Sequence, residues 1–598
     1  MICTYDGIIC TFMKISTHMV FFLIALLVSV IGITPFFFPG NSLVPRSRKF
    51  VVLFFVLYLL ISWCLAYANM PSLAYPLLGD GIIMAIILSL ISTGLNRSVR
   101  GAIVPIAITV IVLGYAFFST APIFHAKAYA AMIGKMSDDR NITHWSKDIE
   151  PIDPKHIRLV PEETAIALAK TALNQNATSG SQASVGSQFD VDVDHITLQK
   201  VKDRLLYVIP LDYRSVGSYE NTAGVPGFII VDAEDPQAKP QFIEKQLMKY
   251  SPESFFEHNL ERHLYTHGYY NKVLTDYSFE LDDNMKPYWV VTVCDPTIGY
   301  SGEKVLGVTV VDPLTGDINF KKVNEVPDWV DRVYPADIVK TYLSDWGNYA
   351  LGWWNSVWAN LNQKTTEDIT LNYGADGRCY YVTPMTSANA KDASMTDLIY
   401  TDTKTGISKR YIVAGTTEEH LLAAVSAKLA YQHLHGVRVI YENVYGRMTA
   451  IISVLGDDGS YRGVAFIDVT NKSILAYDPV PLNALRAYQA LLSQSGGQIA
   501  TDDANDRKTI TAIINRLNYE QTQNGLQLDI YIDTIPHAFY VNCSQFVTAP
   551  FAKVGDTVVM SYYNTPSAGI SVNDFTDKQV HINLSENQRA VDTQNKSK

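Results

Sequence analysis

The sequence predicts a membrane anchor of about four α-helices, then tandem α+β repeats of one helix on an antiparallel sheet, then a small C-terminal β-barrel-like domain. Long apolar runs are confined to the first 124 residues. Beyond them, four helix-start signals recur at intervals of 91, 83 and 82 residues, and each precedes strand and turn patterns. At 598 residues the chain is too long for one hydrophobic core, so we expect several domains.

Composition narrows the classes of partner. The formal net charge is −11, which argues against a sequence-independent grip on nucleic-acid phosphates, because such a grip needs a basic surface. The six cysteines show neither a CxxC pair nor the spacing of a metal site. We therefore expect no cofactor and no bound metal.

Four apolar runs follow an N-terminal tail at 1–17 and define a membrane region at 18–124. They cover about His18–Phe38, Phe50–Ala68, Leu73–Thr93 and Ala102–Phe124. Each approaches the ~20 residues that a helix needs to cross a bilayer. The first run is not followed by a small-residue cleavage site, which disfavours a signal peptide. Four spans are expected, and three are the alternative.

The basic residues of this region predict its orientation. They occur in the loops after the first and third runs, at Arg46, Arg48, Lys49, Arg97 and Arg100. The loop at 69–76 contains none, and Lys14 is a weak opposing signal. Cytoplasmic loops are enriched in Lys and Arg, so the large C-terminal region is predicted to be extracytoplasmic.

Four helices are expected to begin near Pro161, Pro252, Pro335 and Thr417. Proline fits the first position of a helix, and the acidic residues that follow suit the positive end of the helix dipole. The predicted helices are Ala165–Leu173, Phe255–His267, Ile338–Tyr349 and His420–Leu434.

Each helix is followed by a basic residue that opens a strand and, 21 to 28 residues later, by an aspartate in a hairpin turn. The basic residues are Arg204, Lys286, Arg378 and Arg447, and the aspartates are Asp232, Asp312, Asp402 and Asp468. In Val310–Ile318, β-branched arms flank Asp-Pro-Leu-Thr-Gly, a composition typical of a tight turn. The repeating unit is therefore one helix on an antiparallel sheet.

The pattern V-x-V-D-x-x-T-G-x-I resembles the PepSY domain, most closely at Val310–Ile318 and next at Ile399–Ile407. The resemblance implies extracytoplasmic modules that bind or inhibit rather than catalyse. The segment Val326–Pro335, with Asp345-Trp346-Gly347 after it, resembles an uncharacterised family of multi-span membrane proteins from bacteria and large bacteriophages. That resemblance implies a bacterial or bacteriophage source for the chain, and it implies no function.

The C-terminal region is expected to contain helices at Leu482–Gln494 and Arg507–Leu517, then strands from Leu526 onward that form a small barrel-like domain. It is not basic, so contact with nucleic acid is disfavoured. The predicted boundaries after the membrane region are a linker at 125–153, α+β repeats at 154–245, 246–325, 326–413 and 414–480, a helical linker at 481–520, a β domain at 521–586 and a disordered tail at 587–598.

Two segments supply candidate binding residues. Asp328, Asp331 and Arg332 flank Trp329 in a short connection between repeats, where charges around an aromatic ring can form a recognition spot. The alternative is a hinge of paired charges. Trp346, Trp353, Trp354 and Trp358 crowd one helical segment, which suits a core, a binding groove or the membrane interface. The first three are the candidate binding residues.

Other polar patterns favour structural roles. His263 and His267 share a helical face and could hold a metal, but His267 precedes Gly268, as at a helix end. Asp190, Asp192 and Asp194 would point one way on a strand, as an acidic edge.

The sequence offers no nucleophile elbow, phosphate loop or zincin motif, and we assign no catalytic residue. We expect a non-catalytic protein that contacts the lipid bilayer and binds, scaffolds or modulates a protein partner. The alternatives are an envelope hydrolase with a site between repeats, and a phage membrane protein whose C-terminal barrel contacts nucleic acid.

Overall fold

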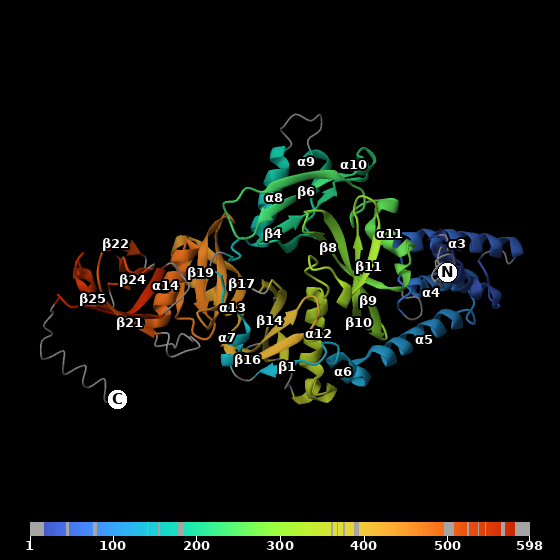
Figure 1. Ribbon diagram of the computed structural model, residues 1–598. Helices are drawn as coiled ribbons and strands as arrows, with labels where there is room; N and C mark the ends of the chain where they lie inside the picture. The colour runs from blue at the N-terminus through green and yellow to red at the C-terminus, as the bar shows by residue number, and fades with distance from the viewer. Residues whose placement is uncertain are drawn as a thin grey trace, which may run out of the picture. The chain divides into compact units, whose positions relative to one another are not determined.

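The computed structural model describes residues 17–43, 47–75, 80–139, 142–153, 156–176, 185–359, 363–366, 369–374, 377–387, 394–494, 507–522, 525–535, 537–543, 546–563 and 569–580 (Figure 1). The chain divides into two compact units. The first comprises 1–138 and 158–413, and the second comprises 139–157 and 414–598. Apolar helices at the N-terminus precede a large region rich in antiparallel sheet, as the sequence predicts. The expected tail at 587–598 lies outside the described residues.

The first unit begins with apolar helices α2 (Thr17–Ile33), α3 (Arg48–Asn69), α4 (Asp80–Asn96) and α5 (Ile103–Thr120). Among the described residues, three helical segments are long and apolar enough to cross a membrane: Met19–Phe37, Arg48–Asn69 and Ile103–Thr120. The apolar helix at Gly81–Asn96 is shorter. The expected third span at Leu73–Thr93 is therefore only partly helical, because residues 73–75 form a turn.

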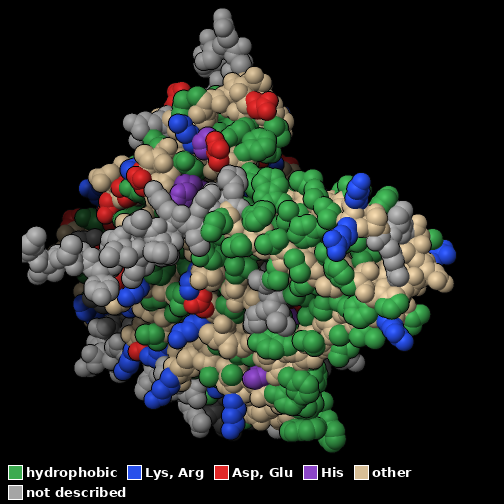
Figure 2. Space-filling view, turned by 90° about the vertical axis from the view of Figure 1, so that its right-hand side faces the viewer, with side chains coloured by type: hydrophobic (Ala, Val, Ile, Leu, Met, Phe, Trp, Pro, Cys, Tyr) green, Lys and Arg blue, Asp and Glu red, His purple; other side chains and the backbone are tan. Residues whose placement is uncertain are grey.

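The two loops that carry the basic residues are joined by hydrogen bonds. Asn96 Nδ2 donates to the carbonyls of Pro35 and Phe38, both at 2.8 Å, and Ser98 Oγ donates to that of Pro39 at 2.6 Å. The loops before α3 and after α4 therefore lie at the same end of the helices. Figure 2 views the molecule from the right-hand side of Figure 1 and shows a broad hydrophobic surface with Lys and Arg side chains on it.

Three antiparallel sheets follow in the first unit. The first sheet has the order β3-β4-β6-β7, with β3 (Thr197–Val201), β4 (Arg204–Ile209), β6 (Val225–Asp232) and β7 (Gln241–Met248). The second has the order β11-β10-β9-β8, with β8 (Val273–Leu281), β9 (Pro287–Ile298), β10 (Ser301–Val311) and β11 (Ile318–Lys322). The third contains β1 (Ser137–Asp139), β12 (Gln363–Thr365), β13 (Thr370–Tyr373), β14 (Cys379–Ser387), β15 (Ser394–Asp402) and β16 (Ser408–Thr416).

Helices α8 (Glu162–Asn176), α11 (Leu260–Thr266) and α12 (Ala336–Tyr349) precede the main strands of these three sheets in the chain. The shorter helices are α6 (Pro122–Ala130), α9 (Val185–Gln188) and α10 (Val216–Glu220), and the small strands β2 (Phe189–Val191) and β5 (Leu211–Tyr213) pair with each other. A continuous core, which includes Phe228, Phe279 and Trp289, joins the first two sheets.

Three of the four predicted repeat helices begin where expected, and α11 does not. That helix was predicted to start after Pro252, but residues 256–258 form a short 3-10 turn and α11 starts at Leu260. Asn259 caps it by accepting a hydrogen bond from Arg262 N at 2.9 Å. Asparagine satisfies an orphan N–H group, which proline cannot do, so the helix begins at the better cap.

The second unit contains a fourth antiparallel sheet in the order β17-β18-β19-β20. Its strands are β17 (Leu434–Val444), β18 (Arg447–Gly456), β19 (Tyr461–Asp468) and β20 (Leu475–Asp478). The helices of this unit are α7 (Ile142–Asp148), α13 (Glu418–Leu429) and α14 (Pro481–Gln494).

A six-stranded sheet contains the last strands of the described residues, in the order β21-β25-β26-β24-β23-β22. Its strands are β21 (Arg507–Ile513), β22 (Arg516–Thr522), β23 (Gly525–Tyr531), β24 (Ala538–Asn542), β25 (Thr557–Tyr563) and β26 (Gly569–Asp577). No pairing between β21 and β22 closes this sheet within the described residues, so the expected barrel is not found there. The helix expected at Arg507–Leu517 is also wrong. Thr509, Ile510 and Thr511 are β-branched and pair with β25 instead.

One set of contacts recurs at the hairpin turn of each of the first four sheets, and we call these the corner contacts. One oxygen of the hairpin aspartate accepts hydrogen bonds from the backbone N–H groups two and three residues further on, and the other oxygen pairs with the basic residue that opens the neighbouring strand. The pairs are Arg204–Asp232 at 2.8 Å, Lys286–Asp312 at 2.7 Å, Arg447–Asp468 at 2.8 Å, and Arg378–Asp402.

A second corner contact fixes the chain that leads into or toward each helix. There, a backbone N–H group donates to the carbonyl of the residue after the hairpin aspartate. These bonds are Val160 to Ala233 at 3.0 Å, Tyr250 to Pro313 at 3.0 Å, Tyr334 to Thr403 at 2.8 Å, and Thr416 to Val469 at 2.9 Å. The hairpin aspartates and their neighbours thus hold turns, strands and helix entries together.

Candidate functional site

The second sheet is docked on the apolar helices through α11. The ring of Tyr265 stacks on that of Phe21 with centroids 5.2 Å apart, and its hydroxyl donates to Pro71 O at 2.9 Å. The guanidinium of Arg262 lies over the ring of Tyr67 at 4.4 Å. Two further bonds tie the α3–α4 loop to the sheet: Leu73 N to Tyr270 O at 2.7 Å and Ser72 Oγ to Lys272 O at 2.9 Å. This loop lies at the opposite end of α3 and α4 from the basic loops.

The predicted binding residues Asp331 and Arg332 lie in a polar junction between the three sheets of the first unit. Asp331 is 6% exposed. One of its carboxylate oxygens accepts hydrogen bonds from Lys200 N at 3.1 Å and from the Tyr373 hydroxyl at 2.9 Å, and its backbone N–H donates to Glu280 at 3.1 Å. Asp331 therefore supports packing and is not open to a partner.

Glu280 and Arg332 complete this junction. Burial, and then the negative charge of Asp331, raise the pKa of Glu280 to about 8. Arg332 Nη2 donates to Thr197 Oγ1 at 3.3 Å. The hydrogen-bonded residues of the junction include both acidic and basic side chains. This arrangement favours the hinge of paired charges over a recognition spot for a partner.

The other two predicted residues of this connection also contact the protein itself. Trp329 stacks on Tyr288 with centroids 5.1 Å apart, and its carbonyl accepts a hydrogen bond from Gln199 at 2.8 Å. The carbonyl of Asp328 accepts one from Lys404 Nζ at 2.6 Å. Of the four predicted residues in this connection, Asp328 alone is exposed.

The alternating aspartates do not share one strand face. β2 ends at Val191, and Asp192 begins a turn in which its Oδ1 accepts hydrogen bonds from the backbone of Asp194 at 3.2 Å and of His195 at 3.3 Å. Aspartate favours such turns because its side chain can bond its own backbone. The acidic-edge prediction is therefore wrong for Asp192, which is buried.

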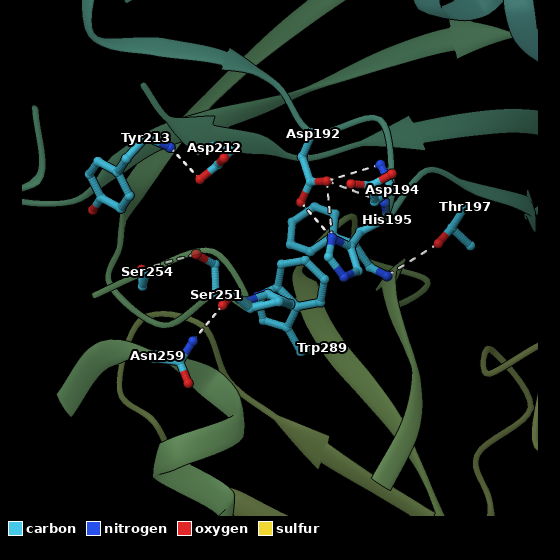
Figure 3. Close-up of polar contacts among 12 residues, drawn as sticks. Asp192, Asp194, His195, Thr197, Asp212, Tyr213, Ser251, Ser254, Asn259 and Trp289 are labelled. Atoms are coloured by element: carbon cyan, nitrogen blue, oxygen red, sulfur yellow. Dashed lines mark hydrogen bonds and ion pairs between the residues drawn. The ribbon is translucent and has the colours of Figure 1, made fainter. Parts of the chain in front are cut away.

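This turn creates an Asp–His pair, shown in Figure 3. Asp192 Oδ2 lies 2.8 Å from His195 Nδ1, and the imidazole meets the Trp289 ring edge-on at 5.6 Å. Burial lowers the pKa of His195, but the hydrogen bond to Asp192 and the negative charges around it together outweigh burial, so the net shift is upward. Burial also raises the pKa of nearby Asp212 to about 7, against the lowering effect of a hydrogen bond from the backbone of Tyr213.

Within the described residues, the Asp–His pair is not joined by a serine, threonine or cysteine that could act as a nucleophile. Ser251 and Ser254 have hydroxyls 2.9 Å apart, and Ser254 donates to Lys249 O at 3.0 Å. Figure 3 shows these serines apart from His195. Among the described residues, no hydroxyl or thiol forms a hydrogen bond with His195, so no nucleophile is in place there.

His263 and His267 contact backbone carbonyl groups near the C-terminal end of α11. Their ring centroids are 4.3 Å apart, but His263 Nε2 lies 2.7 Å from Gly316 O and His267 Nδ1 lies 2.7 Å from His263 O. Gly268 follows with φ of +108°, as at a helix end. No group of three or more His, Cys, Asp or Glu side chains is placed to hold a metal in the part of the chain that the structure describes.

The tryptophan segment separates into a packed and an exposed part. Trp346 is partly buried on α12, and the guanidinium of Arg410 lies 5.2 Å from its ring centroid. Trp353 meets Trp354 edge-on at 4.7 Å, and Trp354 is 62% exposed. Trp358, the fourth tryptophan of the predicted cluster, is 77% exposed.

The structure also contains a shallow, widely open hollow, called the cavity below, that the sequence did not predict. Its volume is about 600 Å³, and it lies where α5 and α6 meet the β9–β10 turn and α12. Its lining residues are Ala116, Phe117, Thr120, Ala121, Pro122, Tyr129, Tyr300 and Asp345. These positions come from three stretches far apart in the chain. The local signal in the sequence is Gly299 beside Tyr300, which marks a turn but does not reveal what the turn contacts.

Comparison with known proteins does not identify a family. No protein-family model matches the chain, and no curated protein matches it. Among solved structures, it is similar to the C-terminal domain of YpeB from Bacillus megaterium, at 13% sequence identity and a TM-score of 0.11. That match covers 44% of this chain and all of the other, and its TM-score is too low to carry an argument.

Proposed function

We propose that this chain is a multi-pass membrane protein that presents tandem PepSY-like α+β units outside the cytoplasm. There they bind, scaffold or modulate a protein partner without catalysis. The docking of α11 on the α3–α4 loop is the observation that carries this proposal.

The orientation follows from that docking. The two basic loops meet at one end of the apolar helices, and the second sheet is fixed at the other end. Positively charged loops remain in the cytoplasm, so the sheets of the first unit would face outward. Since three helices are long enough to span, α4 would cross as a shorter fourth span or remain within the bundle.

The corner contacts support tandem copies of one unit. Four basic–aspartate pairs and four helix-entry hydrogen bonds occupy corresponding positions. The paired side chains and bonded backbone groups make their contacts within one α+β repeat. The sheet edges and turns of each repeat are therefore the surfaces that a partner could contact. β11, for example, is an outer strand of its sheet, and Phe320 on it is 39% exposed. Sheet edges of this kind can pair with an added strand.

Labelling with a membrane-impermeant maleimide tests the orientation. In a background with Cys3, Cys10 and Cys64 changed to serine, Asp283→Cys places a thiol in the exposed turn between β8 and β9, and Val99→Cys places one between α4 and α5. We expect intact cells to be labelled at 283 and not at 99. Labelling at 99 alone would overturn the proposed orientation.

Site-specific photo-crosslinking tests partner binding. A photoreactive residue at Ile407, which is 68% exposed in a hairpin turn, or at Phe320 should give one defined protein adduct in cells. The same residue at buried Val308 is the matched control. If neither exposed position gives an adduct above this control, binding through the sheet edges and turns is contradicted.

A further inference from the structure

The cavity at the end of α5 combines aromatic and apolar lining residues with one carboxylate, that of Asp345. The proposed binding of a protein partner does not explain this combination. Thr120 and Ala121, at the end of α5, line one side of the cavity, and Tyr129 on α6 lines another. The Tyr129 hydroxyl donates to Thr120 O at 2.7 Å, and Tyr300 N donates to Thr120 Oγ1 at 3.0 Å. These bonds fix two tyrosines around the end of an apolar helix.

The β9–β10 turn approaches α5 closely because it contains a glycine. Gly299 has φ of +61°, and a Cβ atom there would lie 2.4 Å from Ser119 Oγ and 2.4 Å from Thr120 Oγ1. Only glycine permits this approach. Tyr300 is thereby held against the helix, and its ring meets that of Tyr115 edge-on at 5.9 Å.

Asp345 brings a negative charge into this aromatic cavity. It lies on α12 and is partly buried, and no described side chain forms an ion pair with it. Burial, and then the charge of Glu303, raise the pKa of Asp345 to about 6. A partly buried carboxylate without a counter-charge is unfavourable unless a cation reaches it.

We propose that this cavity binds the ammonium headgroup of a membrane phospholipid, with the Asp345 carboxylate as its counter-charge and aromatic rings as its walls. Aromatic faces attract ammonium groups through cation–π interactions. A lipid is favoured over a lysine of a partner because α5 forms one wall of the cavity. Ile111, Leu113 and Phe118 of that helix are 62%, 64% and 66% exposed, and they offer a surface for acyl chains.

This inference rests on the proposed membrane topology, since α5 must lie in the bilayer for a lipid to reach the cavity. The labelling experiment tests the topology and does not depend on lipid binding. Lipid retention is measured on purified protein, so the proposed topology and the proposed lipid site can be contradicted independently.

Native mass spectrometry of the full chain, released from nanodiscs with equal amounts of phosphatidylethanolamine and phosphatidylglycerol, tests the proposal. We expect selective retention of phosphatidylethanolamine, reduced about tenfold by Asp345→Asn, which removes the charge and keeps the shape. Asp337→Asn, an exposed position on the same helix, is the matched control and should retain the lipid. A thermal melt of each variant shows whether it is folded.

Three results would overturn the proposal. One is equal retention of the two lipids, and another is full retention by folded Asp345→Asn. The third concerns glycerophosphoethanolamine, which has the same headgroup without acyl chains. If it binds as tightly as the lipid, the cavity recognises an ammonium group but not a lipid.

Discussion

The junction around Asp331 and the cavity beside Asp345 both place a carboxylate between elements that are far apart in the chain. In the junction, backbone and side-chain donors surround the carboxylate, and Asp331 is 6% exposed. In the cavity, the residues that line the wall with Asp345 are aromatic or otherwise mostly apolar, and Asp345 has no ion-pair partner among the described side chains. The difference indicates that the satisfied carboxylate holds sheets together, whereas the unsatisfied one has room for a ligand.

The largest expected effect comes from breaking the junction. Asp331→Ala removes the acceptor of Lys200 N and one acceptor of the Tyr373 hydroxyl, which should cost about 3 kcal/mol. We expect the midpoint of thermal unfolding to fall by roughly 6–12 °C. Asp328→Ala, in the same connection, is the matched control because Asp328 is exposed. A fall of similar size in the control would contradict the structural role assigned to Asp331.

The turn that forms one wall of the cavity gives the next effect. Gly299→Ala forces a Cβ atom into Ser119 and Thr120 at a left-handed backbone position, which should cost about 1–3 kcal/mol. We expect Tyr300 to leave the cavity and lipid retention to fall. Gly134→Ala is the control, because it has a similar φ of +77° but no atom within 4 Å of the added Cβ. Equal loss in both variants would point to backbone strain alone.

The pH dependence of lipid retention sharpens the comparison further. A pKa of about 6 means that Asp345 is mostly neutral at pH 5 and mostly charged at pH 7. Retention of phosphatidylethanolamine should therefore rise about tenfold over this range, and Asp345→Asn should abolish the rise. Glu303, Tyr129 and Tyr349 are the other titratable groups near this carboxylate, and a rise that persists in Asp345→Asn would assign the effect to them.

The same carboxylate should affect stability in the opposite direction. Because its pKa is raised in the folded state, Asp345 destabilises the empty fold increasingly as the pH rises from about 4 to about 6. Thermal melts of lipid-free protein should therefore show that Asp345→Asn gains stability relative to the unsubstituted chain over this range. A difference that does not change with pH would contradict the raised pKa.

The smallest effect is expected at an exposed corner pair. Lys286 pairs with Asp312 at 2.7 Å, but the lysine side chain is 46% exposed, so the pair should contribute about 0.5 kcal/mol. Burial raises the pKa of Asp312, but the hydrogen bond from Lys286 and those from the backbone outweigh it and lower the pKa overall. The stabilisation is therefore present above about pH 4 and is lost as the pH falls further.

Lys286→Met should lower the thermal midpoint by roughly 1–2 °C at pH 7. The difference from the unsubstituted chain should shrink below about pH 4. A loss as large as that of Asp331→Ala would show that the corner pairs contribute more to stability than their exposure indicates.

Local chemistry accounts for the parts of the fold that could be predicted from the sequence. The helix at Pro335 and the turn at Asp312 follow from residues that are neighbours in the chain, and both are found. The start of α11 was missed because Asn259 competes with Pro252 as the residue that begins the helix. β21 was mistaken for a helix because its partner, β25, lies about fifty residues away.

The sites were harder to predict for the same reason. Asp331 looked like a recognition residue because its partners Lys200 and Tyr373 are distant in sequence. Asp345 lies beside a predicted tryptophan, yet its cavity depends on the end of α5 and on Tyr300. Burial by distant elements decides which carboxylate is satisfied, and local sequence does not reveal it.

The most direct test measures thermal stability and phosphatidylethanolamine retention together on Asp331→Ala and Asp345→Asn. We expect the first variant to melt at a lower temperature while it retains the lipid below its transition. We expect the second to melt at or above the temperature of the unsubstituted chain and to lose the lipid. If Asp345→Asn retains the lipid, or if Asp331→Ala leaves stability unchanged, the division between a structural and a ligand-binding carboxylate is contradicted.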